Sequence, residues 1–395
     1  MRGYIILSII LIVAVGILAI LIKYPPYEQQ QPVTIKENMT LRHIAERNDV
    51  PLHALVSLLD SEDRKDFITT FKNIHTPLHN QNIDKDKIRS AILEERAGGI
   101  PPKDLIRFLL WSIALALAGL LLIRKKGIPG IRRLWMMATF TLFGIILGAS
   151  PNPMEATVRL HKLIKGIPGN PLILVSLTFA TVTLLSLLGA RMLCSWGCPL
   201  GAIQESLHNI PVLRQFKKRH KFSFAASIAV RITFYLLFVL LLFRILNINQ
   251  GGPGSILYHH VNLFKIFDPY ELARFTIILI PIFLIASLLV FRPFCHTICP
   301  FGLWAWVFEK ASLYKVRKVN PDACVDCRQC EEACPTEAMK AVNANKRGFW
   351  KPDCWSCGNC LAACPHGALE FARTSRNVTV KERKILSKSE KIPST

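Results

Sequence analysis

The chain has 395 residues, of which 51% are apolar and only 19% are charged. That balance rules out a disordered chain and argues against an ordinary soluble enzyme. Lysine and arginine outnumber aspartate and glutamate by 49 to 27, which in so apolar a chain indicates the cytoplasmic flanks of membrane helices rather than nucleic-acid binding. All twelve cysteines lie after residue 193, and this clustering indicates cofactor ligation rather than a disulfide framework.

Six apolar stretches are long enough to cross a bilayer as helices. They lie at about 4–22, 105–123, 134–150, 172–190, 224–247 and 275–291. No small-residue cleavage pattern follows the first, so residues 1–23 are predicted to be an uncleaved anchor, with a cleaved signal peptide as the alternative. Arg231 lies in or near the fifth span, either as a functional intramembrane charge or at the inner membrane boundary.

The short loops between these spans predict the orientation of the chain. Loops 124–133 and 191–221 carry eleven basic residues, whereas loops 151–171 and 249–274 carry five. Because loops rich in lysine and arginine stay inside, both termini and all cysteines are predicted on the cytoplasmic side of a prokaryotic cytoplasmic membrane. Thiols on that side stay reduced and available to metal.

Residues 24–103 are predicted to form a small helical extracytoplasmic domain. Helix starts are expected after Thr40, at Asp49-Val50-Pro51, and at Asn82 or Asp84. Two short helices around a turn could suggest a DNA-binding motif, but the outside location and the nearly balanced charge argue against it. The segment is therefore interpreted as a docking or spacer domain.

Residues 319–372 carry two cysteine runs of identical spacing, C-x2-C-x2-C-x3-C-P, which is typical of a small α+β ferredoxin with two [4Fe–4S] clusters. Since the three-cysteine loop is tight, the fourth cysteine of each run is predicted to ligate the other cluster. Structural zinc is the alternative. The basic tail 373–395 is predicted to be disordered or to lie on anionic lipid. The predicted ligands are Cys324, Cys327, Cys330 and Cys364 for cluster 1, and Cys354, Cys357, Cys360 and Cys334 for cluster 2.

A second repeat, R-x2-C-x3-C-P, begins at Arg191 and again at Arg292, directly after the fourth and sixth predicted spans. Two related hairpins would bring four thiolates together, the number that a cluster needs. A dithiol switch, a Cu(I) site and small buried apolar residues are the alternatives. Arg191 and Arg292 could favour the thiolate form by their charge. The four cysteines are Cys194, Cys198, Cys295 and Cys299.

These spans, the paired C-x3-C-P motifs and the C-terminal ferredoxin resemble the NapH/NosR/CcoG group of membrane-bound polyferredoxins, over about residues 104–372. The resemblance implies quinol-linked electron supply to respiratory reductases, or metal handling and cofactor maturation. Segment 24–103 has no flavin-attachment pattern, so the chain departs from NosR-type proteins while its NapH-like core is intact.

Histidines and haem motifs give weaker indications. No C-x2-C-H occurs, which argues against covalent c-type haem, and no histidine lies inside a predicted span, which argues against b haems. His161, His259 and His260 occupy similar places in the two predicted hairpins, where they could contact a quinone head group or an outer partner. The alternative is that lipid head groups or loop backbone satisfy them.

The sequence thus predicts an α-helical integral membrane protein with about six transmembrane helices, a membrane domain at 104–318 and a C-terminal ferredoxin. The leading interpretation is an electron carrier between the quinone pool or a membrane partner and a redox partner protein, as an electron-transfer subunit of a quinol dehydrogenase system. A copper-handling reductase or maturation factor of the CcoG type is the alternative. A structural anchor with rigidifying clusters is a third possibility.

Overall fold

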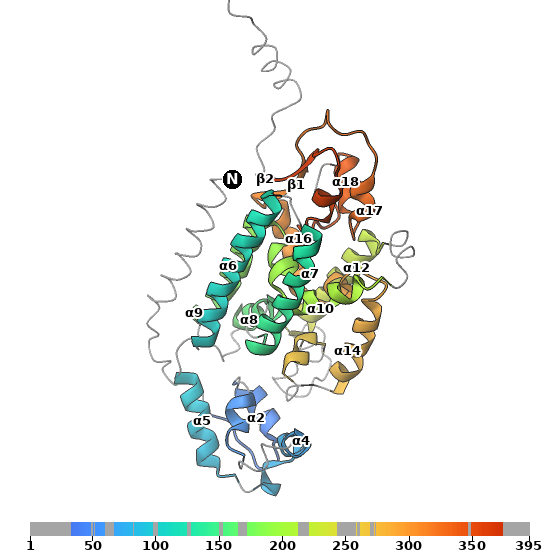
Figure 1. The fold of residues 1–395 in the computed structure, drawn as a ribbon. Coiled ribbons are helices and arrows are strands. Elements are labelled where there is room, and N and C mark those ends of the chain that lie inside the picture. The colour runs from blue at the N-terminus through green and yellow to red at the C-terminus, as the bar shows by residue number, and fades with distance from the viewer. Residues whose placement is uncertain are drawn as a thin grey trace, which may run out of the picture.

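Three parts follow one another along the long axis of the computed structural model (Figure 1). Helices of residues 33–97 lie at one end, a helical body fills the middle, and the ferredoxin lies at the other end. The predicted anchor 4–22, the tail after residue 373, His259 and His260 lie outside the described residues. The structure describes residues 33–48, 50, 52–59, 67–81, 83–97, 102–124, 128–149, 153–164, 172–211, 221–242, 258, 261–268, 272, 274–346 and 349–373.

The end module has its own small core, in which Leu41, Ile44, Leu55, Ile88 and Ile92 are fully buried. Helices begin at the three places that the sequence predicts, and one further helix, α4, precedes the third. The helices are α2 (Leu41–Asn48), α3 (Leu52–Val56), α4 (Phe67–His75), the 3-10 turn η1 (Leu78–Asn80) and α5 (Lys85–Ala97).

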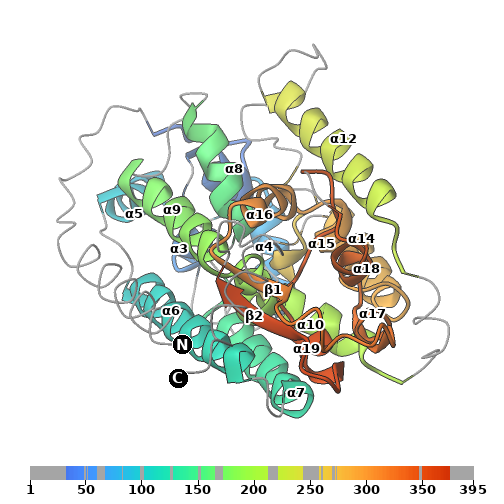
Figure 2. The same ribbon diagram turned by 90° about the horizontal axis from the view of Figure 1, so that it is seen from above.

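The helical body consists of apolar helices that surround shorter connecting segments (Figure 2). Helix α7 passes directly into the π-helical segment η2 at residue 140, so the two form one rod. The elements are α6 (Pro102–Arg124), α7 (Ile128–Thr139), η2 (Phe140–Ile146), α8 (Pro153–Ile164), α9 (Leu172–Gly189), α12 (Phe224–Leu242), the 3-10 turn η4 (Leu263–Phe267) and α14 (Arg274–Ala286).

Six transmembrane helices are not confirmed. Within the described ranges, only Ile106–Arg124 and Phe224–Leu241 are long and apolar enough to cross a membrane, whereas the apolar parts of α9 and α14 are shorter. The 13 residues of α14 rise about 20 Å, less than the roughly 30 Å of a hydrocarbon core, because the apolar run turns after Ala286. Ile146, Ile278 and Ile285 are nevertheless well exposed, an apolar outer surface that gives weak support to a membrane location.

Each R-x2-C-x3-C-P motif forms a helix–helix junction in which the second cysteine precedes the next helix. Cys194 lies in the π-helical η3 (Leu193–Gly197) and Cys295 in α15 (Pro293–Thr297). Cys198 and Cys299 are the N-caps of α10 (Pro199–His208) and α16 (Pro300–Lys310). Pro199 and Pro300 begin these helices, since proline at the first helical position lacks only an N–H that would have no partner.

The ferredoxin is closed by a two-stranded antiparallel sheet. Strand β1 (Tyr314–Lys318) pairs with β2 (Leu369–Arg373), with Tyr314 opposite Arg373. The amide of Leu313 donates to the carbonyl of Leu187 at 2.7 Å, which ties this sheet to the end of α9. Between the strands lie α17 (Gln329–Ala333), α18 (Ala338–Asn343) and α19 (Asn359–Ala363).

Candidate iron–sulfur centres

Two cavities in the ferredoxin are each lined by four cysteines. All eight are free thiols that surround space instead of converging on one point, an arrangement that fits a polynuclear cluster. The structure groups the residues as the spacing predicts, while their ligation of clusters stays a prediction. The cluster-1 cavity is lined by Cys324, Cys327, Cys330 and Cys364, and the cluster-2 cavity by Cys334, Cys354, Cys357 and Cys360.

Each three-cysteine loop wraps its cavity through left-handed residues at matching positions. Asp326 and Arg328 have φ of 53° and 58° in the first run, and Ser356 and Gly358 have φ of 50° and 86° in the second. Alternation between left- and right-handed residues turns successive N–H groups toward a concave side, where they stabilise an anion. The loops therefore suit a negatively charged thiolate cluster.

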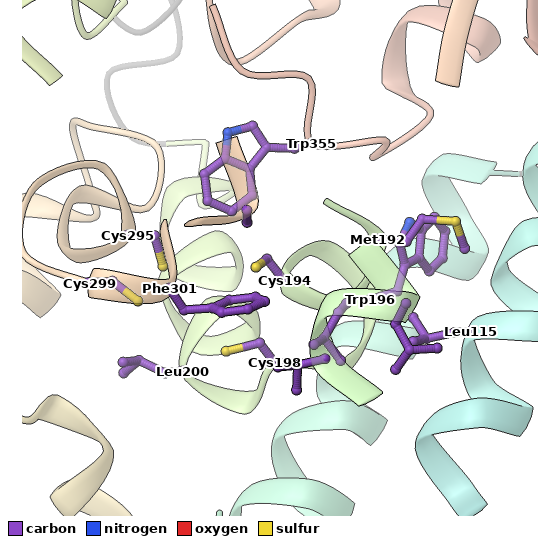
Figure 3. Packing of buried hydrophobic residues seen from close by; sticks show 14 of the residues in the cluster. Leu115, Met192, Cys194, Trp196, Cys198, Leu200, Cys295, Cys299, Phe301 and Trp355 are labelled. Carbon is purple, nitrogen blue, oxygen red and sulfur yellow. The ribbon is translucent and has the colours of Figure 1, made fainter. Parts of the chain in front are cut away.

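The cysteines of the two R-x2-C-x3-C-P motifs meet in the helical body. Figure 3 shows the pair from η3 and α10 facing the pair from α15 and α16, with Leu200 and Phe301 as apolar neighbours. Burial raises the pKa of Cys198, and the neighbouring thiols Cys295 and Cys194 raise it further. Metal binding at such a site would displace protons. We refer to Cys194, Cys198, Cys295 and Cys299 as the four-thiol centre.

The glycine that follows each Cys-Pro pair explains the C-P-x-G form of the motif. The amide of Gly201 donates to Cys198 Sγ at 3.4 Å, at the N-terminus of α10. A Cβ on Gly201 would overlap the guanidinium of Arg292, and one on Gly302 would lie 2.6 Å from the carbonyl oxygen of Cys295. The motif needs glycine there because the carbonyl oxygen of its own first cysteine occupies that space at both positions, as does the arginine of the other motif at Gly201.

A buried carboxylate holds two arginines on one side of the centre. Glu205 Oε1 lies 2.5 Å from Arg132 Nε, and Glu205 Oε2 lies 2.5 Å from Arg292 Nη2. Burial raises the pKa of Glu205, but the two cations outweigh that effect and lower it to about 2. Arg292 also donates to the carbonyl of Cys194. We name these three residues the Glu205 triad.

A second triad mirrors the first, but its carboxylate comes from the ferredoxin. Asp353 Oδ2 lies 2.9 Å from Arg191 Nη1 and 2.6 Å from Arg231 Nη2. Arg191 donates to the carbonyl of Gly302, across the centre from its own motif. Arg231 donates to His296 Nδ1 at 2.9 Å, and burial together with this cation lowers the pKa of His296, so the imidazole is neutral. Asp353, Arg191 and Arg231 are the Asp353 triad.

The two triads leave a positive surplus beside the four-thiol centre, since four buried arginines face two carboxylates, and burial raises the pKa of the third buried acid nearby, Glu309, to about 7. Uncompensated buried charge is costly unless an opposite charge lies nearby. Four thiolates around an iron–sulfur cluster would supply that negative charge. The donor set and its surroundings therefore fit a cluster at the four-thiol centre.

The other candidate residues have different surroundings in the structure. Arg191 and Arg292 are fully buried and bind the motif backbone, and Arg231 belongs to the ferredoxin junction. His161 lies on helix α8 and not in a loop: its Nδ1 lies 2.8 Å from the Thr157 carbonyl and its Nε2 lies 2.5 Å from Tyr235 Oη. Backbone of the predicted loop 151–171 thus pairs with His161, as the alternative supposed, but that backbone is helical, and the second partner is a tyrosine.

Sequence reasoning missed the carboxylates of both triads and their arginine partner Arg132. One signal was available, because Glu205 is the only acidic residue between Glu155 and Asp268. An isolated carboxylate in a basic, apolar region needs a buried cation partner. Asp353 gave no comparable signal, since the ferredoxin contains several other acids.

Comparison with known families agrees with this arrangement. A model described as a 4Fe-4S dicluster domain matches residues 316–373, and one described as a 4Fe-4S binding domain matches residues 171–219 and 272–311. The first covers both ferredoxin runs and the second covers both R-x2-C-x3-C-P motifs. No solved structure shows significant similarity to the chain.

Several relatives are ferredoxin-type proteins. NapH of Escherichia coli is 25% identical over 199 residues, which cover 48% of this chain and 65% of NapH. YccM of Escherichia coli, named for electron transport, is 26% identical over 185 residues, covering 46% and 50%. MauN of Methylorubrum extorquens, named for methylamine utilization, is 23% identical over 301 residues, covering 73% and 98%. The predicted resemblance is thus confirmed: the chain matches 4Fe-4S domains in both cysteine regions and is similar to ferredoxin-type proteins such as NapH.

Proposed function

We propose that the chain relays single electrons through three [4Fe–4S] clusters, held by the four-thiol centre, the cluster-2 cavity and the cluster-1 cavity. The observation that carries this proposal is the meeting of four cysteines from two distant motifs inside a surplus of buried arginine charge. The charge favours a bound anionic cluster over neutral thiols. Clusters of this kind exchange one electron without making or breaking covalent bonds in a substrate.

The exposure of the cysteines supports an order in which the three clusters pass electrons. Cys327 is exposed at the cluster-1 cavity, whereas Cys357 and Cys360 of the cluster-2 cavity are buried against the helical body. Electrons are therefore exchanged with a soluble redox partner at cluster 1, and with a membrane-bound donor or acceptor near the four-thiol centre. Cluster 2 connects the two.

A quinone is the proposed membrane partner. His161, Tyr235, Phe238 and Trp304 form an aromatic group in which His161 lies within 6.4 Å of each other ring centre. Trp304 is on α16, the helix that Cys299 caps. A planar head group with two oxygens suits such aromatic surfaces beside hydrogen-bonding side chains. In the cell the ferredoxin end would face the cytoplasm, because it carries the basic residue Arg124 in the last turn of α6.

Iron counting tests the proposal. The purified wild-type protein should contain about twelve iron atoms per chain, and the serine variant of all four residues of the four-thiol centre about eight. A matched variant with serine at all four cluster-1 cysteines should lose the same amount while keeping the remaining EPR signals. About eight iron atoms in the wild type would contradict the third cluster. Stoichiometric copper that disappears in the first variant would support the copper-handling alternative instead.

A further inference from the structure

Trp355 is the side chain of the ferredoxin that enters the four-thiol centre. It follows Cys354 in the second run, is only 2% exposed, and lies above the gap between Cys194 and Cys295 (Figure 3). Its ring centre lies 4.3 Å from Arg191 Cζ and 5.1 Å from Arg292 Cζ. Both distances are within the range of cation–π attraction.

Both arginines continue from this ring into the opposite motif. Arg292 donates to the backbone carbonyls of Cys194 and, at 3.1 Å, of Ser195, and Arg191 donates to that of Gly302. A single layer of guanidinium groups therefore separates the indole from the backbone of the four-thiol centre. The indole itself is bonded to the chain beside Cys354, so packed atoms connect the two candidate clusters without interruption.

A second tryptophan crosses the same junction in the other direction. Trp196 lies between Cys194 and Cys198, is fully buried, and donates from Nε1 to the carbonyl of Ser356 at 2.9 Å. Arg132 Cζ lies 4.5 Å from its ring centre. The cysteine loop of each centre thus inserts a tryptophan toward the other, and the relative position of the two centres is fixed from both sides.

Packing alone does not explain an indole at position 355. Its Nε1–H finds no acceptor among the described residues, and a buried donor without a partner is unfavourable. Phenylalanine or an aliphatic side chain would fill space here without that cost. What the indole adds is a large polarisable ring in contact with two cations, at the junction between the centres.

We propose that Trp355 is the electronic contact between the four-thiol centre and cluster 2, an inference that rests on a cluster being present at the four-thiol centre. In the exchange, one cluster is oxidised by one electron while the other is reduced by one, and no proton or bond is transferred. The indole stays in its ground state and provides the packed path that tunnelling electrons follow more readily than a gap.

The test uses the full-length protein and a flash-activated photoreductant, with freeze-quench EPR to follow each cluster. Trp355→Leu should slow reduction of the cluster at the four-thiol centre by about tenfold or more, leaving clusters 1 and 2 at wild-type rates. Trp355→Phe should keep most of the rate because it keeps a ring. The matched control Trp350→Leu, at a tryptophan that is 65% exposed, should change nothing.

A structural role would give a different result. The magnetic interaction between the two clusters depends on their separation, so it should persist in Trp355→Leu while the rate falls. A wild-type rate at full iron content, or loss of the magnetic interaction together with the rate, overturns the proposal. If Trp355→Leu loses iron, Trp355→Met replaces it, and iron loss in both also overturns it. Only about eight iron atoms in the wild type would contradict the third cluster itself, and this outcome is distinguishable from a failure of the Trp355 proposal.

Discussion

The two cysteine runs of the ferredoxin have the same spacing but different surroundings. In the first run, the residue after the leading cysteine is Val325, 61% exposed, whereas in the second it is the buried Trp355. Asp353 stands directly before the second run, where the first has Ala323. Spacing thus determines which cysteines share a cavity, and the residues between and beside them determine whether the cavity faces solvent or the helical body.

The largest difference is expected from Asp353, which holds the second run to the body. Asp353→Ala should leave Arg191 and Arg231 buried without their carboxylate, at a cost of about 3–5 kcal/mol in the free energy of unfolding. Chemical denaturation in detergent, monitored by the absorbance of the clusters, measures this loss of unfolding free energy. The matched change Ala323→Asp in the first run should have almost no effect. Equal stability of the two variants would contradict the role of the Asp353 triad.

A smaller difference is expected at the left-handed position after the second cysteine of each run. A Cβ on Gly358 would lie 2.7 Å from Leu122 Cδ2 and 3.0 Å from Ile128 Cγ2, so Gly358→Ala should destabilise the protein by about 1–3 kcal/mol. Arg328→Ala should be nearly neutral, because Arg328 is exposed and already has a Cβ at φ 58°. Unfolding midpoints of both variants decide it, and a neutral Gly358→Ala would show that the ferredoxin is not held against α6 and α7.

The smallest effect concerns one hydrogen bond at cluster 1. Asn343 Nδ2 lies 3.5 Å from Cys330 Sγ, and hydrogen bonds to sulfur raise cluster potentials. Asn343→Leu removes a hydrogen bond worth about 1 kcal/mol, so it should lower the reduction potential of cluster 1 by roughly 40 mV. An EPR-monitored redox titration measures it, with cluster 2 as the internal control. A shift of both clusters by the same amount would show a general change in structure instead.

Local spacing made part of this molecule predictable. The grouping of eight cysteines around two cavities follows from loops too short to close on four ligands, and the repeat of R-x2-C-x3-C-P indicated two related halves. The helix starts near Thr40 and Asp49 follow from capping residues. Each of these inferences needs only neighbours within one motif or one turn of chain.

Contacts between distant segments were not predictable in the same way. Arg231 pairs with Asp353 across 122 positions, and nothing near Arg231 indicates that its partner lies in another domain. The apolar runs at 134–150 and 275–291 suggested membrane spans, but the chain forms a π-helical segment in the first and turns after Ala286 in the second, shortly before Cys295. Tertiary packing outweighed hydropathy there.

The exchange of the fourth cysteine between runs has a consequence for biogenesis. The cluster-1 cavity needs Cys364 from the second run, and the cluster-2 cavity combines Cys334 with the cysteines of the second run. Neither cavity can therefore be completed before the second run has been synthesised. Arg191 and Arg231 likewise emerge more than a hundred residues before Asp353. Since chains fold from the N-terminus as they are made, the helical body can form before either ferredoxin cluster, and iron–sulfur assembly at both cavities must follow the synthesis of residue 364.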